Sequence, residues 1–400
     1  MNRMESVDNN AVREHNQRAI LEYIYRIGTT SRAALAKELK MSKPAIADNL
    51  EHLIDIGIVK EVGEGESTER GGRRPRLLQF HSNQKYIIVI DLNFSNPLFV
   101  LSNLSNEIFC EFNVTVHANA PADSYLSIIE NGIRILMDSY NLSAEDLVCV
   151  SVASPGMFDF DGNLCSCNPS YNGFPWASID IRTYLQSSFN IPVIIKNDIK
   201  AATLGEWEKC GNMTNDMLYI SCGLGLGAGI ILNGELLEGN YFTAGELFAY
   251  TDAGRLTHGQ TIENLICLNH LLFSLEQGVQ NGVTTSLKYT DGLTLDDVIV
   301  AYKQGDPYVC DSIRSIGREL GIIALNCSTF LSIRSIVFGG EYAVFSELIL
   351  EEMYKIFAAR VNYTPQISIS KLGRYAGIYG MLSIARAYYF DFICKKQPTV

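Results

Sequence analysis

The chain has 400 residues, of which 47% are hydrophobic and 19% charged, and its formal net charge is −12. This length exceeds one ordinary core and predicts two or three domains, while the apolar content excludes an extended disordered protein. No apolar stretch approaches the roughly 20 residues that a membrane span needs, and the first residues lack the apolar segment of a signal peptide. We therefore expect a globular, cytoplasmic protein without membrane contact.

The negative charge is unevenly distributed along the chain. Residues 1–80 carry 13 basic and 12 acidic side chains, whereas the remaining residues carry 19 and 32. A surface that binds DNA is therefore expected in the front part. Because that part is nearly neutral, such a surface depends on local clustering of cations.

The front part has the pattern of a winged helix-turn-helix. Apolar residues at helical spacing end at Gly28, which predicts a first helix over about 14–27. A second helix follows closely, and Ser42 can cap a third helix that ends before Gly57. Short strands are predicted at 58–62 and 77–80, on either side of a polar, glycine-rich run. Three helices and a β-hairpin predict a winged helix-turn-helix DNA-binding domain over residues 1–80.

Two groups of residues in this domain are candidates for DNA contacts. One lies at the start of the third helix, where base edges and phosphates are approached, and the other in the wing, where guanidinium groups can grip phosphates or enter the minor groove. The candidates are Ser42, Lys43, Pro44, Ala45 and Asp48 in the helix and Arg70, Arg73, Arg74 and Arg76 in the wing. The carboxylate of Asp48 can accept a hydrogen bond from cytosine but is repelled by phosphate. The alternative for the arginine-rich run is a solvated linker between domains. The alternative for the whole module is a domain that binds another protein.

From residue 86 onward, apolar runs alternate with helical stretches, which indicates an α/β fold. Strands are predicted at 86–90, 99–101, 148–152 and 191–198, and a helix near 122–139. The last of these strands delivers Asn197 and Asp198 at its carboxyl end, where ligands bind in open α/β sheets. Asp198 can remove a proton from a sugar hydroxyl or accept its hydrogen bond. Alternate glycines over 223–229 can bring backbone amides close to a phosphate.

Taken in order, these motifs resemble the ROK family, named for repressors, open reading frames and kinases. The matching residues are Ser154, Pro155, Gly156, Asp159, Gly162, Asn168, Pro169, Trp176, Lys196 through Asp198, the glycine run, Gly245, Glu246, and Phe338 through Gly340. The repressor branch of the family adds a winged helix and a Gly-Arg-x-Pro junction, which here begins at Gly72. The resemblance covers nearly the whole chain.

The resemblance implies an α/β, two-lobed fold of the actin/hexokinase (ribonuclease H-like) type. The first lobe is expected over 84–198 together with about 380–400, and the second over 199–379. A sugar is expected in the cleft between them, where the resemblance places Asn197, Asp198, Glu246 and Glu263 near sugar hydroxyls. Asp198 takes the position of the catalytic base of the kinases. Any of these carboxylates can instead be an ordinary charge, Glu263 above all.

Two departures from the family pattern argue against phosphoryl transfer. The kinases have Asp-x-Gly-Gly-Thr-Lys in the first phosphate loop, whereas this chain continues after Asp91 with side chains at Asn93 and Phe94 that obstruct the approach of a phosphate. In the second loop, Leu224 replaces a threonine. Phosphoryl transfer depends on such positioned groups, so their loss should suppress it severely.

No metal and no other cofactor is expected. Family members with zinc have one histidine and three cysteines where this chain has Ala249, Gly254, Leu256 and Thr261. The missing histidine commonly also contacts sugar, which leaves the identity of the ligand open. The ten cysteines follow no repeating spacing, and the close pair Cys165 and Cys167 lacks a second pair or a histidine nearby. His258 has no thiol partners in its part of the chain.

The sequence thus predicts a sugar-responsive transcriptional regulator, a repressor of carbohydrate-utilisation genes, with a sensor domain that is not an enzyme. Its expected partners are double-stranded operator DNA, a small sugar or sugar-phosphate effector, and further copies of itself in a homodimer or homotetramer. One alternative is an ATP-dependent sugar kinase with an appended DNA-binding domain, favoured by Asp198 and the glycine run. The other is a ligand-independent regulator whose cleft has decayed, suggested by Ala249.

Overall fold

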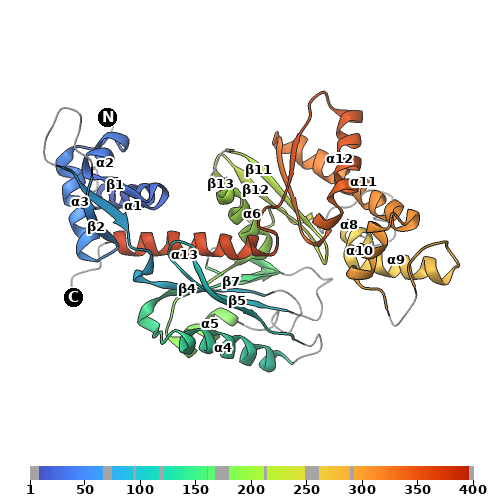
Figure 1. Cartoon of the computed structure of the whole chain (residues 1–400), viewed down its shortest axis with the longest axis horizontal. Coiled ribbons are helices and arrows are strands. Elements are labelled where there is room, and N and C mark those ends of the chain that lie inside the picture. The colour runs from blue at the N-terminus through green and yellow to red at the C-terminus, as the bar shows by residue number, and fades with distance from the viewer. Residues whose placement is uncertain are drawn as a thin grey trace.

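The chain folds into an N-terminal winged domain followed by two five-stranded α/β sheets (Figure 1). A computed structural model describes residues 9–65, 74–92, 96–116, 121–159, 161–166, 180–210, 214–247, 261–288 and 292–395. The C-terminal helix α13 (Ala376–Cys394) lies across the middle of the molecule and ends beside the winged domain. Within the described ranges, no helix is both long and apolar enough to cross a lipid bilayer.

The winged domain forms as its capping residues predict. Ser31 and Ser42 each accept a hydrogen bond from a backbone amide three residues further on, at 3.3 Å, which fixes the starts of the second and third helices. The prediction of a winged helix-turn-helix is confirmed, although the first helix begins earlier than expected and a short strand was missed. Its elements are α1 (Asn9–Ile27), β1 (Thr29–Ser31), α2 (Arg32–Glu38), α3 (Lys43–Asp55), β2 (Val59–Glu64) and β3 (Arg76–Phe80).

The first five-stranded sheet has the order β10-β7-β4-β5-β6, in which β4, β7 and β10 are parallel. Its strands are β4 (Tyr86–Asp91), β5 (Leu98–Asn103), β6 (Ile108–Asn113), β7 (Leu147–Ser154) and β10 (Val193–Asn197). Helices α4 (Ala122–Ser139) and α5 (Ile181–Phe189) pack on one face, and α13 packs on the other. Burial on both faces explains the unbroken apolar runs of these strands. A hairpin of β8 (Met157–Phe158) and β9 (Leu164–Ser166) follows β7.

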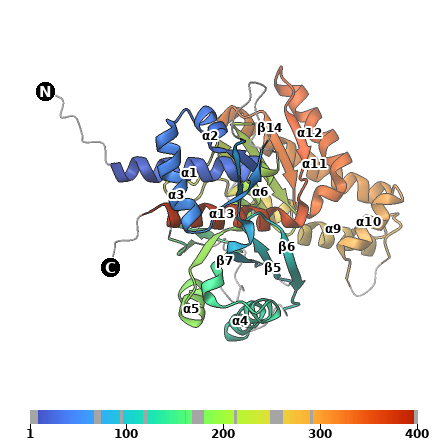
Figure 2. The same ribbon diagram turned by 60° about the vertical axis from the view of Figure 1, so that its left-hand side comes forward.

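The second sheet has the same topology: a three-stranded antiparallel meander with two parallel strands added beside its first strand. Its strands are β11 (Met217–Cys222), β12 (Leu226–Leu232), β13 (Glu235–Leu236), β14 (Ser335–Gly339) and β15 (Gln366–Ile369). The helices of this part are α6 (Asp198–Lys209), α8 (Ile262–Ile266), α9 (Leu268–Gln280), α10 (Leu295–Lys303), α11 (Pro307–Leu331) and α12 (Ser346–Arg360). Figure 2 shows α11 and α12 side by side on the outer side of this sheet. The expected α/β architecture is confirmed.

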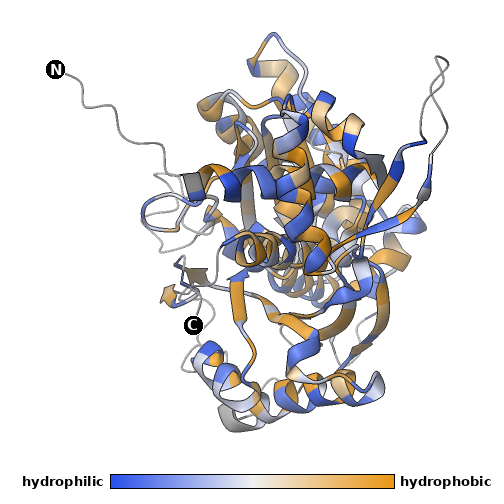
Figure 3. Cartoon of the chain, turned by 90° about the vertical axis from the view of Figure 1, so that its left-hand side faces the viewer, coloured by the Kyte–Doolittle hydropathy of each residue, from blue (hydrophilic) through white to orange (hydrophobic). Residues whose placement is uncertain are grey.

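Helices α6 and α13 cross in close contact because glycines line the crossing. A Cβ atom on Gly380 would lie 1.8 Å from the carbonyl oxygen of Ala201, and one on Gly205 would lie 2.2 Å from that of Ala376. Only glycine therefore allows this approach of the two backbones. Figure 3 shows hydrophobic residues on the strands and on the inner sides of the helices, consistent with cores between the layers. The crossing joins α6, which begins at the carboxyl end of β10, to the helix that reaches the winged domain.

Candidate ligand pocket and DNA-binding surface

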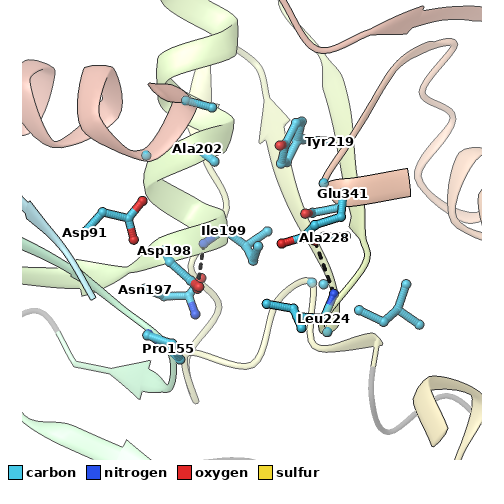
Figure 4. A pocket seen from close by; sticks show the side chains of 18 of the residues that line it. Asp91, Pro155, Asn197, Asp198, Ile199, Ala202, Tyr219, Leu224, Ala228 and Glu341 are labelled. Atoms are coloured by element: carbon cyan, nitrogen blue, oxygen red, sulfur yellow. Dashed lines mark hydrogen bonds between the residues drawn. The ribbon is translucent and has the colours of Figure 1, made fainter. Parts of the chain in front are cut away.

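A cavity of about 320 Å³ lies between the two sheets, at the carboxyl ends of their parallel strands. Asp91 ends β4, Asn197 ends β10, and Glu341 follows β14, so both sheets contribute polar side chains to its wall. Figure 4 shows these side chains converging on one space, with the glycine loop that contains Leu224 opposite Asp198. The size and mixed polarity suit a small polyol.

Asn197 and Asp198 lie where a strand passes directly into a helix. The Asn197 amide oxygen accepts a hydrogen bond from the Lys200 backbone amide at 2.9 Å, and its nitrogen donates to the Gly156 carbonyl at 2.9 Å. The Asp198 carboxylate accepts from the Ile199 amide at 2.8 Å. Asn197 is thereby fixed against the loop after β7, and Asp198 is left facing the cavity at the start of α6.

Burial raises the pKa of three carboxyl groups that line the cavity. The pKa of Asp91 rises to about 7, mainly through burial and further through Asp198 and Glu341. Burial likewise raises the pKa of Asp198 to about 6 and that of Glu246 to about 7, although Lys200 opposes the shift of Glu246. Near neutral pH the wall therefore holds both carboxylates, which accept hydrogen bonds, and protonated carboxyl groups, which donate them. Such a mixture suits sugar hydroxyls.

Exchange of Asp91 for asparagine is expected to stabilise the fold at high pH. A carboxyl group whose pKa rises to about 7 on folding favours the folded state below its unfolded pKa of about 4, and this contribution is lost as the pH rises through 7. Urea denaturation at pH 8 should show Asp91→Asn more stable than the wild type by about 4 kcal/mol, with little difference at pH 4. The exposed Asp311→Asn is the control, and equal effects of Asp91→Asn at both pH values would refute the assignment.

The fourth residue predicted to bind sugar, Glu263, does not line the cavity in this structure, and its contact with sugar stays a prediction. Glu263 lies in α8 and is 4% exposed, and its Oε1 atom accepts a hydrogen bond from the Leu226 amide at 3.2 Å. Among the described residues, the cavity is lined by Asn197, Asp198 and Glu246 but not by Glu263. Its carboxylate supports the glycine loop, because the Leu226 amide is its partner.

Two carboxylates of the cavity, those of Asp91 and Glu341, were not predicted as site residues. Asp91 was predicted only as the first residue of a degenerate phosphate loop, and Glu341 directly follows the family residues Phe338 through Gly340. Glu341 Oε2 accepts a hydrogen bond from the Leu224 amide at 3.2 Å, across 117 residues of sequence. Both residues lie at or just after the carboxyl end of a parallel strand, and this position was the signal that could have identified them.

Several residues of the earlier predictions lie outside the described ranges: Arg70, Arg73, Asn93, Phe94, Cys167, Asn168, Pro169, Trp176, Ala249, Gly254, Leu256 and His258. Thr261 is described, and its hydroxyl caps α8. In the part of the chain that can be described, no three His, Cys, Asp or Glu side chains are arranged to hold a metal ion.

The recognition helix presents its start to solvent. Ser42, Lys43, Pro44 and Asp48 are exposed and Ala45 is half-buried, whereas Ile46, Leu50 and Leu53 form the core beneath. All five predicted contact positions of α3 therefore lie on its accessible side.

The base of the wing forms a second basic surface, in which one arginine was not anticipated. Arg32, Arg74 and Arg76 line a hollow of about 480 Å³ between the start of α2 and β3. Glu61 pairs with Arg76 at 2.6 Å and with Arg32 at 2.9 Å. Glu61 offsets part of the charge of Arg76, so Arg74 remains the exposed wing arginine without an ion pair among the described residues.

Comparisons with known proteins agree with this architecture. A sequence model of winged helix-turn-helix DNA-binding domains matches residues 13–60, and that of the ROK family matches residues 99–388. The chain is 26% identical to the xylose repressor of Caldicellulosiruptor bescii over 93% of its own length and 96% of the repressor. It is 24% identical to an N-acetylglucosamine repressor of Escherichia coli, over 85% and 83% of the two chains.

Among solved structures, the fold resembles that of a ROK family transcriptional regulator described as a homologue of the E. coli MLC protein. The TM-score is 0.79 at 20% identity, with 96% of this chain and 98% of that chain covered. The match therefore includes the winged domain as well as both sheets. Because the ROK family model spans most of the sequence, the chain belongs to the ROK family.

Proposed function

We propose that the protein is a sugar-responsive transcriptional repressor that binds operator DNA through its winged domain and a small sugar in the cavity between its sheets. The observation that carries this proposal is the presence, on one chain, of an exposed recognition helix and a polar cavity joined by two crossing helices. The names of the two relatives, a xylose repressor and an N-acetylglucosamine repressor, support regulation by a sugar over the kinase alternative.

In the sugar site, Asp198 and Glu246 are proposed to contact hydroxyl groups directly, and Asn197 to hold the start of α6 in place. The side-chain amide of Asn197 is already hydrogen-bonded to both Lys200 and Gly156, which supports a positioning role. Closure of the cavity around a polyol would draw the loop after β7 and the glycine loop towards α6, because all three line the cavity. Movement of α6 is the proposed response to sugar.

A chain of contacts links the far end of α6 to the winged domain. The Glu208 carboxylate lies near the C-terminal end of α6 and accepts hydrogen bonds from Arg386 of α13 at 3.1 Å. The Arg386 guanidinium lies 4.1 Å from the centre of the Tyr25 ring of α1, and Phe80 packs edge-on against Phe390 at 5.7 Å. A shift of α6 can therefore change the position of the winged domain. For this to regulate, the sugar must prefer one of the two arrangements.

Operator recognition is proposed to require at least a homodimer. A two-fold symmetric protein reads a symmetric site with two recognition helices, and a change in their spacing alters the fit to both half-sites. Since the proposed target is chromosomal DNA, we expect the protein to act in the cytoplasm.

The sugar site is tested by thermal unfolding of the purified protein with a panel of sugars that includes D-xylose and N-acetylglucosamine. One sugar should raise the melting temperature in a concentration-dependent way, because a ligand that binds only the folded state stabilises it. Asp198→Asn and Glu246→Gln should weaken the binding of that sugar at least about tenfold, the loss expected when a buried partner of a hydroxyl is changed. Lys303→Glu, at an exposed position of helix α10, should leave the binding of that sugar unchanged. If no sugar raises the melting temperature, the ligand-independent regulator is favoured instead.

A further inference from the structure

The glycine loop between β11 and β12 already has carboxylates on its backbone amides. The Leu224 amide donates to Glu341 Oε2 and the Leu226 amide to Glu263 Oε1, each at 3.2 Å, while the Gly223 amide donates to the Gly225 carbonyl at 3.0 Å. In loops that bind phosphate, such amides point at the oxygens of the anion. Here two side chains of the protein itself supply those oxygens.

Glu341 lies directly against the loop on the side of the cavity. A Cβ atom on Gly223 would come within 1.8 Å of Glu341 Oε2, so the carboxylate fills the space that the missing side chain leaves. Glu341 is exposed and lines the cavity, in contrast to Glu263, which is buried and does not line it. Figure 4 shows the hydrogen bond from the loop amide at Leu224 to Glu341. Of the two carboxylates, Glu341 is therefore the one that a ligand meets.

The other acidic groups of the cavity, which are partly ionised near neutral pH, also disfavour an anion. Asp91, Asp198 and Glu246 line it together with Glu341, and Arg374 is the one basic residue among the described residues of the wall. Arg374 is engaged by Glu111 at 3.4 Å and by the Tyr375 hydroxyl at 2.7 Å. Like charges at close range repel more strongly in a partly buried site than in water. A phosphate group next to the loop would therefore find the amides of Gly223, Leu224 and Leu226 already engaged and would face several carboxyl groups.

We infer that Glu341 acts as an internal substitute for phosphate, so that the cavity accepts an uncharged sugar and rejects sugar phosphates and nucleotides. This inference rests on the proposed sugar site and specifies its ligand class. Glu341 is thereby a specificity-determining residue. Its removal exposes the Leu224 amide and takes away one negative charge, which restores part of an anion site.

The test is isothermal titration calorimetry of the full-length protein with inorganic phosphate and ADP. Wild type, Glu341→Gln, Glu341→Gly and the control Glu347→Gln, an exposed change in the next helix, are compared. Both Glu341 variants should bind phosphate or ADP at least about tenfold more tightly than wild type and the control, since loss of a close like charge favours the anion. Glutamine keeps the shape of the side chain and glycine removes it, and melting curves verify that both variants fold. Equal anion binding by all four proteins would overturn the inference.

A second titration separates this inference from the proposed function. Wild type is titrated with D-xylose, D-glucose and glucose 6-phosphate, and an uncharged sugar should bind more tightly than the phosphorylated one. Tighter binding of glucose 6-phosphate than of both uncharged sugars would contradict the inference but leave sugar sensing intact. If no sugar binds wild type while Glu341→Gln gains phosphate, the proposed function fails and the role of Glu341 stands.

Discussion

Exchange of Lys43 for glutamate is expected to weaken operator binding about 100-fold at physiological salt, through loss of one phosphate contact and gain of a repulsive charge. Lys43 is the exposed first residue of α3, where a recognition helix approaches DNA. A carboxylate is favourable at a helix N-terminus, so the fold should tolerate the change. The measurement is fluorescence anisotropy of a labelled operator fragment over a range of salt concentrations. The slope of log operator affinity against log salt concentration should also become shallower, by about one released counterion.

The control for this variant is Lys303→Glu, which makes the same change of charge in α10 of the second sheet region. A long-range effect of net charge would weaken DNA binding equally in both variants, whereas a local contact affects Lys43→Glu alone. If Lys43→Glu binds the operator as tightly as the control does, α3 does not face the DNA. The winged domain would then be reassigned to protein contacts.

The second large effect is expected from Tyr25→Leu, which should uncouple DNA binding from sugar binding. Tyr25 provides the ring beneath the Arg386 guanidinium, and leucine preserves apolar volume while removing the cation–π contact. The sugar-induced change in operator affinity should fall at least about tenfold, a typical size for a coupling free energy between sites. Sugar affinity without DNA and operator affinity without sugar should change little, because Tyr25 lies in neither site.

Two further variants test the uncoupling: a matched control substitution, and a change at a second contact on the route between α6 and the winged domain. Phe392→Leu replaces a half-exposed ring of α13 and should retain full sugar response. Glu208→Gln removes the negative charge that Arg386 contacts on α6. The double variant with Tyr25→Leu should therefore lose no more coupling than either single variant. Full response in Tyr25→Leu, or additive losses in the double variant, would exclude the proposed route.

Much of the fold could be predicted from the sequence because its signals are local. The helix expected near 122–139 is observed at Ala122–Ser139, and the serine caps of α2 and α3 bind the amides that their positions indicate. Strand β1 escaped prediction because three residues carry no periodic pattern. The winged domain was recognisable from helix spacing and caps, whereas its packing on α13 joins ends of the chain that no local pattern relates.

The site could be predicted only where its residues adjoin a recognisable motif. Asn197 and Asp198 follow a buried strand, and Glu246 follows a glycine of the family pattern, so all three were identified. The contact of Glu263 with sugar stays a prediction, since its carboxylate accepts a hydrogen bond from the Leu226 amide and does not line the cavity. Glu341 was not predicted, because its partner amide is remote in sequence.

The central claim, that a sugar in the cavity controls DNA binding, is tested most directly by selecting genomic fragments at fixed salt with and without each sugar of the panel. The account predicts enrichment of a two-fold symmetric site, whose affinity changes at least about tenfold with one uncharged sugar and not with its phosphate. An enriched site whose affinity no sugar alters, although one sugar demonstrably binds the protein, would contradict it.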